Sequence, residues 1–135
     1  MDQAAGLEGR LSELVAFRDV DWLTVPDRPG VYVIHDRDEV VYVGMAGRNG
    51  RGSLRNRLRD HASGQIVNMF AQYLFLARVQ FIPTERITHP RDAKSACRDY
   101  IRDRCSFRYL ATDTGEDARR FENDLKARLK PSLNS

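Results

Sequence analysis

The chain has 135 residues, of which 41% are hydrophobic and 30% are charged, and its formal net charge is +3. These values are typical of one folded domain with its own core, and they exclude a wholly disordered chain. No apolar run reaches the ~20 residues that a membrane span requires. The N-terminal residues lack the basic start and apolar stretch of a secretory signal. We therefore expect a cytoplasmic protein without a membrane partner.

The N-terminal third predicts a helix, a connector and a hairpin. Leucine and valine recur at helical spacing in "LEGRLSELVAF", which predicts a helix over 6–17, and the region 1–28 reads as this helix plus a connector. Two alternating apolar stretches at 30–35 and 40–45 flank the charged turn "DRDE". Such neighbouring stretches predict an antiparallel hairpin.

A glycine-rich loop, "GMAGRNGRGS", follows the hairpin. Ser53 at its end is a suitable N-cap for a helix over 54–62. The basic segment 48–59 contains five arginines and no acid. It could form a solvated helix face, but clustered guanidiniums repel one another unless an anion binds. We therefore expect a phosphate-binding surface formed by Arg48, Arg51, Arg55 and Arg59.

The C-terminal half predicts a helical insert, a strand and a final helix. Within the insert at 65–105, the apolar run 65–82 favours a helix that could continue into a strand, and Pro90 opens a helix over 91–105. A strand over 106–112 and a helix over 115–130 follow. The expected fold is a single α+β domain over 1–135, with a small mixed sheet of about three strands, the hairpin plus a third strand, flanked by helices.

Two cysteines, Cys97 and Cys105, lie in the segment that we expect to be helical. At ~1.5 Å per residue they would be ~12 Å apart, which is too far for a disulfide. The sequence around them also lacks the histidine spacing of a zinc site. We expect buried, reduced thiols.

Two helices place ionisable residues beside an apolar stripe. In the helix that begins at Leu54, Arg57 and His61 lie one turn apart at the edge of the leucine stripe, as residues at the rim of a cleft would. In the last helix, Glu122 falls inside the buried arc. Because an uncompensated buried carboxylate is costly, Glu122 must be paired or bind a metal, and a salt bridge to an arginine is the simplest alternative.

Three motifs together resemble the GIY-YIG nuclease superfamily. The hairpin carries "GVY" and "YVG" with tyrosines ten residues apart, the next helix reads "LRNRLRDH", and the terminal segment reads "FENDLKARLKPSLN". The resemblance covers residues 29–62 and 106–134. It implies a site made of six residues: Tyr32, Tyr42, Arg57, His61, Glu122 and Asn134.

The resemblance also implies hydrolysis of DNA by water with one divalent ion, Mg²⁺ or Mn²⁺. The residue types fit this chemistry. A glutamate such as Glu122 is the hard oxygen ligand that Mg²⁺ prefers, and Arg57 offers permanently charged donors to phosphate. Tyr42 is the candidate general base or proton relay and Tyr32 a positioning residue. His61 could supply charge, accept a proton or hold phosphate.

One departure from the family is Met45, which stands where many members have a lysine. We expect Arg48 or Arg51 to replace that cation, or to bind a flanking phosphate. The leading interpretation is a metal-dependent DNA endonuclease. The alternatives are a site-specific, restriction-type enzyme and a catalytically silent nucleic-acid-binding module of the same fold. The insert 65–105 leaves open base-reading residues or a homodimer surface, and its apolar part 66–82 leaves open a protein-interaction domain.

Overall fold

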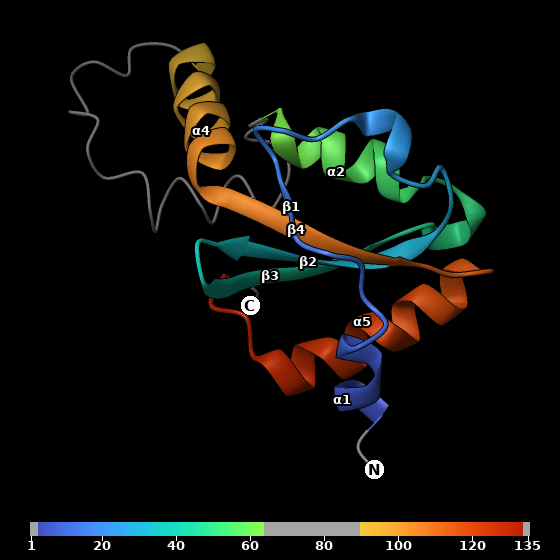
Figure 1. Cartoon of the computed structure of the whole chain (residues 1–135). Coiled ribbons are helices and arrows are strands. Elements are labelled where there is room, and N and C mark those ends of the chain that lie inside the picture. The colour runs from blue at the N-terminus through green and yellow to red at the C-terminus, as the bar shows by residue number, and fades with distance from the viewer. Residues whose placement is uncertain (1–2, 64–89, 134–135) are drawn as a thin grey trace.

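The computed structural model describes residues 3–63 and 90–133. They form an α+β domain in which helices cover both faces of one antiparallel sheet (Figure 1). The sheet order is β1-β4-β2-β3. The strands are β1 (Val15–Ala16), β2 (Gly30–Asp36), β3 (Glu39–Ala46) and β4 (Cys105–Ala111). The helices are α1 (Gln3–Glu8), α2 (Leu54–Ala62), α4 (Pro90–Arg104) and α5 (Gly115–Leu129), with short 3-10 helices η1 (Trp22–Thr24) and η2 (Arg48–Gly50).

The sequence prediction of an α+β fold with a hairpin and a further strand is confirmed, and the sheet differs in two details. It contains a fourth, very short strand, β1, and every pairing in the described residues is antiparallel. The helices expected over 54–62, 91–105 and 115–130 are present within a residue or two of those bounds. The predictions for 65–82 fall outside the described residues.

The helix predicted over 6–17 is wrong in extent, because α1 ends at Glu8. Beyond it the chain extends along the sheet: Ser12 N–H donates to the Tyr109 carbonyl at 2.8 Å, and Tyr109 N–H donates to the Ser12 hydroxyl at 3.0 Å. Val15 then pairs with Phe107. Hydrogen bonds to an open sheet edge therefore outweigh the helical spacing of the leucines, and Leu14 is left 54% exposed.

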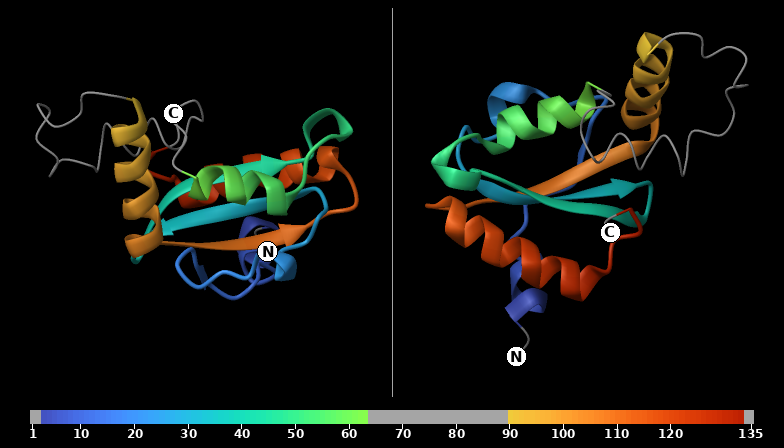
Figure 2. Two further views of the ribbon diagram at one scale, coloured as in Figure 1. Left: turned by 90° about the horizontal axis from the view of Figure 1, so that it is seen from above. Right: turned by 180° about the vertical axis from the view of Figure 1, so that it is seen from behind.

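Each face of the sheet has its own core. On one face, Tyr32, Ile34 and Phe107 pack with α2, α4 and η1. On the other face, β-strand valines pack against Leu125 of α5 and Leu7 of α1. Figure 2 shows α5 along the face opposite α2. Among the described residues, no helix is both long and apolar enough to cross a bilayer.

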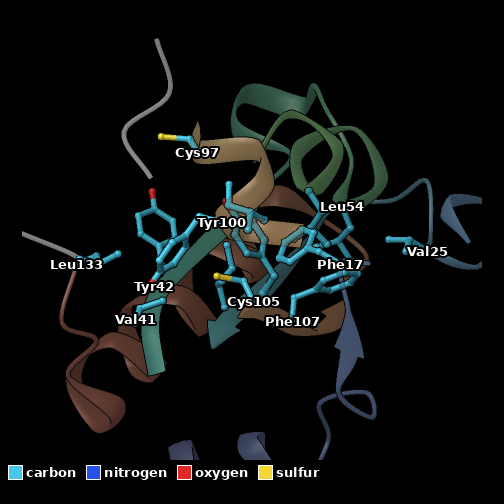
Figure 3. Close-up of a cluster of buried hydrophobic side chains, with 14 of the residues drawn as sticks. Phe17, Val25, Val41, Tyr42, Leu54, Cys97, Tyr100, Cys105, Phe107 and Leu133 are labelled. Carbon is cyan, nitrogen blue, oxygen red and sulfur yellow. The ribbon is translucent and has the colours of Figure 1, made fainter. Parts of the chain in front are cut away.

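The cysteines lie in the first of these cores, where both are buried and neither forms a disulfide among the described residues. Only Cys97 is helical, because Cys105 is the first residue of β4 rather than the end of the preceding helix. Figure 3 shows this core, with Leu133 beside Val41 and Tyr42. Leu133 N–H donates to the Val41 carbonyl at 2.8 Å, so the C-terminal segment is attached to the outer edge of β3.

Candidate active site

A cleft of about 500 Å³ opens where the hairpin, the glycine-rich loop, α2 and α5 meet. It brings together residues that are far apart in the sequence. Four of the six predicted site residues line it, and so do two of the four predicted DNA-binding arginines. These are Tyr32, Tyr42, Arg57, Glu122, Arg48 and Arg51.

The hairpin places its two tyrosines side by side. Tyr32 pairs with Gly44 across the strands, and Ile34 pairs with Tyr42, so the two rings point to the same face with centroids 6.4 Å apart. A Cβ on Gly44 would lie 2.5 Å from Tyr32 Cζ. The glycine of "YVG" is therefore required because the Tyr32 phenol occupies the space of its side chain.

The sequence predicts His61 at the rim of the cleft, and this prediction is wrong. His61 instead lies beneath the two tyrosines. It is fully buried, and its Nε2 is hydrogen bonded to the Tyr32 hydroxyl at 2.5 Å. Its ring is 5.4 Å from the ring of Tyr32 and 5.5 Å from that of Tyr42. The helix-wheel count erred because the tyrosines cover this side of α2. A residue so enclosed can exchange a proton with Tyr32, but it does not reach a phosphate in the cleft.

Tyr32 is held as a neutral phenol. Burial is the main reason that the pKa of Tyr32 lies far above its ordinary value, and neighbouring Tyr42 and Glu122 raise that pKa further. Arg57 opposes this effect through its charge and a side-chain hydrogen bond. Arg57 and Glu122 line the same cleft as Tyr32, with opposite charges.

Arg57 is a half-buried cation facing both phenols. Burial lowers the pKa of Arg57, but the adjacent Tyr32 and Tyr42 outweigh that effect, and the pKa is raised overall. The guanidinium therefore stays charged at physiological pH. It is the group that can stabilise negative charge on a phenolate or on a phosphate oxygen.

Glu122 reaches the cleft from the opposite layer of the molecule. It is 9% exposed, as its place in the buried arc of α5 predicts. Its described ion pair is with Lys126, one turn further along α5, with Nζ 3.8 Å from Oε2, and not with an arginine. A distance this long leaves the carboxylate oxygens able to accept another cation.

The glycine-rich loop forms one end of the cleft. Gly47, Gly50 and Gly52 all have positive φ, which lets the backbone turn tightly before α2. A Cβ on Gly115, the first residue of α5, would clash with the Gly47 carbonyl, so the loop and α5 are in direct contact. The Ser53 hydroxyl caps α2 as predicted, accepting from Asn56 N–H at 3.2 Å.

The predicted DNA-binding arginines separate into two groups. Arg48 and Arg51 line the cleft. Arg55 donates from Nε to the Val25 carbonyl at 2.9 Å and so holds the connector to α2. Arg59 is exposed and does not line the cleft.

Several cleft residues were missed by the sequence analysis. Lys126, Asp60 and Asn56 line the cleft beside the predicted residues. Their helical spacing was the available signal: Lys126 lies four residues after Glu122, and Asp60 lies three residues after Arg57. Met45 also lines the cleft, as expected of the residue after the "YVG" glycine.

A single divalent ion is compatible with this donor set. Glu122 is the carboxylate that would hold it, and the remaining positions of a hard cation are commonly filled by water and phosphate oxygens. The described residues contain no cluster of three or more histidine, cysteine or acidic side chains. Asn134 lies outside the described residues.

Comparison with known families agrees with this geometry. A family model described as the GIY-YIG catalytic domain matches residues 23–135, and the chain belongs to this family. Membership implies a nuclease-type function. A comparison with curated proteins gives no match.

Proposed function

We propose that this protein is an endonuclease that hydrolyses DNA phosphodiester bonds in the cleft, with one divalent ion held by Glu122. The observation that supports it is the convergence of Glu122, two phenols and a guanidinium, from both layers of the fold, on one cleft. Phosphodiester hydrolysis needs an activated water and stabilisation of charge on the phosphoryl oxygens. The side chains of the cleft can supply both.

Each side chain has a distinct role in this proposal. Tyr42 accepts the proton of the attacking water, and it lines the cleft beside the charged Arg57. Tyr32 stays protonated and positions the reacting groups with His61 behind it. Arg57 binds a phosphate oxygen, and Asn134 remains part of the proposed site by family resemblance. The ion, Mg²⁺ or Mn²⁺, supplies Lewis-acid stabilisation of the phosphate.

The test is nicking of a supercoiled plasmid by the purified protein in Mg²⁺ or Mn²⁺, compared with EDTA. Glu122→Gln should lower nicking by at least about 100-fold, since it removes the ion's carboxylate. Asp124→Asn is the matched control because it removes one negative charge from the face of α5 that lines a different cavity, with Phe121. Nicking that survives EDTA, or that is equal in Glu122→Gln and the native protein, would refute the proposal.

The second candidate is a catalytically silent nucleic-acid-binding module. It is favoured by Met45, which places an uncharged side chain in the cleft where many family members have a cation. Retained DNA binding without nicking in either metal would select this module. If nicking occurs, the fragment pattern from long DNA distinguishes a restriction-type enzyme from one without a defined site.

A further inference from the structure

Lys126 has a position in the cleft that a simple helix ion pair does not explain. It lies one turn beyond Glu122, with Nζ 3.8 Å from the carboxylate, and 37% of its side chain is exposed. The separation of 3.8 Å is at the outer limit of an ion pair, so this contact holds the partly exposed ammonium group only weakly. Lys126 nevertheless lines the cleft together with the predicted site residues. Its ammonium group is therefore open to an anion that enters the cleft.

The axis of α5 gives Lys126 a definite place relative to the other cations. Gly115 at the start of α5 is in contact with the glycine-rich loop. At ~1.5 Å per residue, Glu122 lies ~10 Å along the helix from that contact, and Lys126 lies a further ~6 Å along. The backbone of the loop that carries the arginines thus lies toward the N-terminal end of α5 from Glu122, and Lys126 lies toward the C-terminal end.

We propose that Lys126 binds a DNA phosphate next to the one that is hydrolysed, on the side of Glu122 away from the glycine-rich loop. This inference rests on the proposed function. Charges along one strand of duplex DNA are spaced ~3.4 Å along the axis, so a backbone centred at Glu122 has a phosphate within reach of a flexible lysine one turn away. Without DNA, the ammonium returns to Glu122 and offsets its charge. When DNA is bound, the loop arginines and Lys126 contact its backbone at the two ends of the cleft.

The experiment measures binding of a short DNA duplex in EDTA, where the proposed chemistry is off, over a series of salt concentrations. The logarithm of affinity falls as the logarithm of salt concentration rises. In Lys126→Gln this fall should be less steep by ~0.9, the value for one lost phosphate contact. Lys126→Arg should keep the native slope. Lys130→Gln is the matched control, because Lys130 is an exposed residue at the end of α5 that does not line the cleft, and its slope should be native.

Loss of Lys126 also leaves Glu122 unpaired, which could weaken DNA binding by repulsion. The comparison is therefore repeated between Glu122→Gln and the Glu122→Gln/Lys126→Gln double variant, in which no ion pair exists to be broken. A salt dependence that is less steep by ~0.9 in the double variant than in Glu122→Gln supports the phosphate contact. Equal slopes overturn it and leave Lys126 as a helix ion pair.

The outcomes separate this inference from the proposed function. Metal-dependent nicking that needs Glu122, together with an unchanged slope in Lys126→Gln, rejects the role of Lys126 alone. A reduced slope without nicking rejects the endonuclease and retains the contact. No DNA binding by the folded native protein rejects both. Circular dichroism establishes that each variant is folded.

Discussion

Gly44 and Tyr32 share one space in the hairpin. Tyr32 is 1% exposed, and its phenol fills the volume next to the Gly44 Cα. The position of the Tyr32 hydroxyl against His61 therefore depends on the absence of a side chain across the strand pair. At the scale of single residues, the glycine of the "YVG" motif is part of the site although it carries no functional group.

Gly44→Ala should displace Tyr32, destabilise the fold by ~1–3 kcal/mol as overpacking does, and lower nicking strongly. Gly6→Ala is the control, because a Cβ there meets nothing within 4 Å, and it should leave activity unchanged. Urea unfolding and plasmid nicking measure the two effects. A fully active Gly44→Ala would show that the placement of Tyr32 is not needed.

Tyr100 should make stability depend on alkaline pH. Its hydroxyl donates to Asp36 Oδ2 at 2.5 Å, and burial together with this bond raises the pKa of Tyr100 to about 12. The unfolded pKa is about 10, so the contribution of Tyr100 is complete below pH 10 and is lost as pH rises from 10 toward 12. Tyr100→Phe should lower stability at pH 7 by ~1–3 kcal/mol and flatten the decline above pH 10.

Urea unfolding at fixed pH values between 7 and 12 measures both effects. An equally steep decline above pH 10 in Tyr100→Phe and the native protein would contradict the assignment. The bond also matters for the fold, because Asp36 ends β2 and Tyr100 lies in α4. It attaches α4 to the hairpin that carries the two site tyrosines.

At the scale of elements, arginines of the glycine-rich loop and of α2 have different surroundings. Arg48 and Arg51 line the cleft, while Arg55 binds backbone carbonyls of the connector. The sequence pattern is the same for all three. Only the direction in which each side chain leaves its loop or helix distinguishes an arginine that lines the cleft from one that holds the connector.

Replacing Arg48 and Arg51 together with alanine should weaken DNA binding and lower its salt slope by up to ~0.9 for each lost contact. Arg55→Ala should instead lower stability, because it leaves the Val25 carbonyl without the Arg55 donor. Duplex binding across salt concentrations and urea unfolding separate the two effects. A native slope in the double variant would remove the loop from the DNA-binding surface.

At the scale of the whole molecule, the site is divided between the two layers of the fold. The phenols, Arg57 and His61 belong to the layer of α2, whereas Glu122 and Lys126 come from α5 on the other face (Figure 2). Neither layer holds the complete cleft. The proposed activity therefore requires the sheet and both layers to be assembled at once.

Nicking activity should consequently be lost in the same urea transition as the structure. Trp22 is the only tryptophan, and its ring stacks on Phe107 at 6.1 Å between the centroids, so its fluorescence reports on the α2 layer. Far-UV circular dichroism reports on the whole. Loss of activity at clearly lower urea than both signals would show that α5 detaches before the rest unfolds.

Much of the fold could be predicted because its elements have local causes. The hairpin follows from alternation around a short turn, α2 from the Ser53 cap, and α5 from its apolar stripe. The burial of Glu122 follows from the same helical spacing. The first helix was predicted too long because hydrogen bonds from Ser12 to β4 involve residues far apart in sequence.

The sequence by itself determined the residue types of the site, the order of their elements and the family resemblance, because periodicity, caps and motif spacing are local properties of the chain. Only the tertiary structure decided that His61 is enclosed behind Tyr32, that Arg55 holds the connector and that Arg59 does not line the cleft. The reason is physical: burial and side-chain direction depend on what packs from the other elements, and no local pattern contains that information.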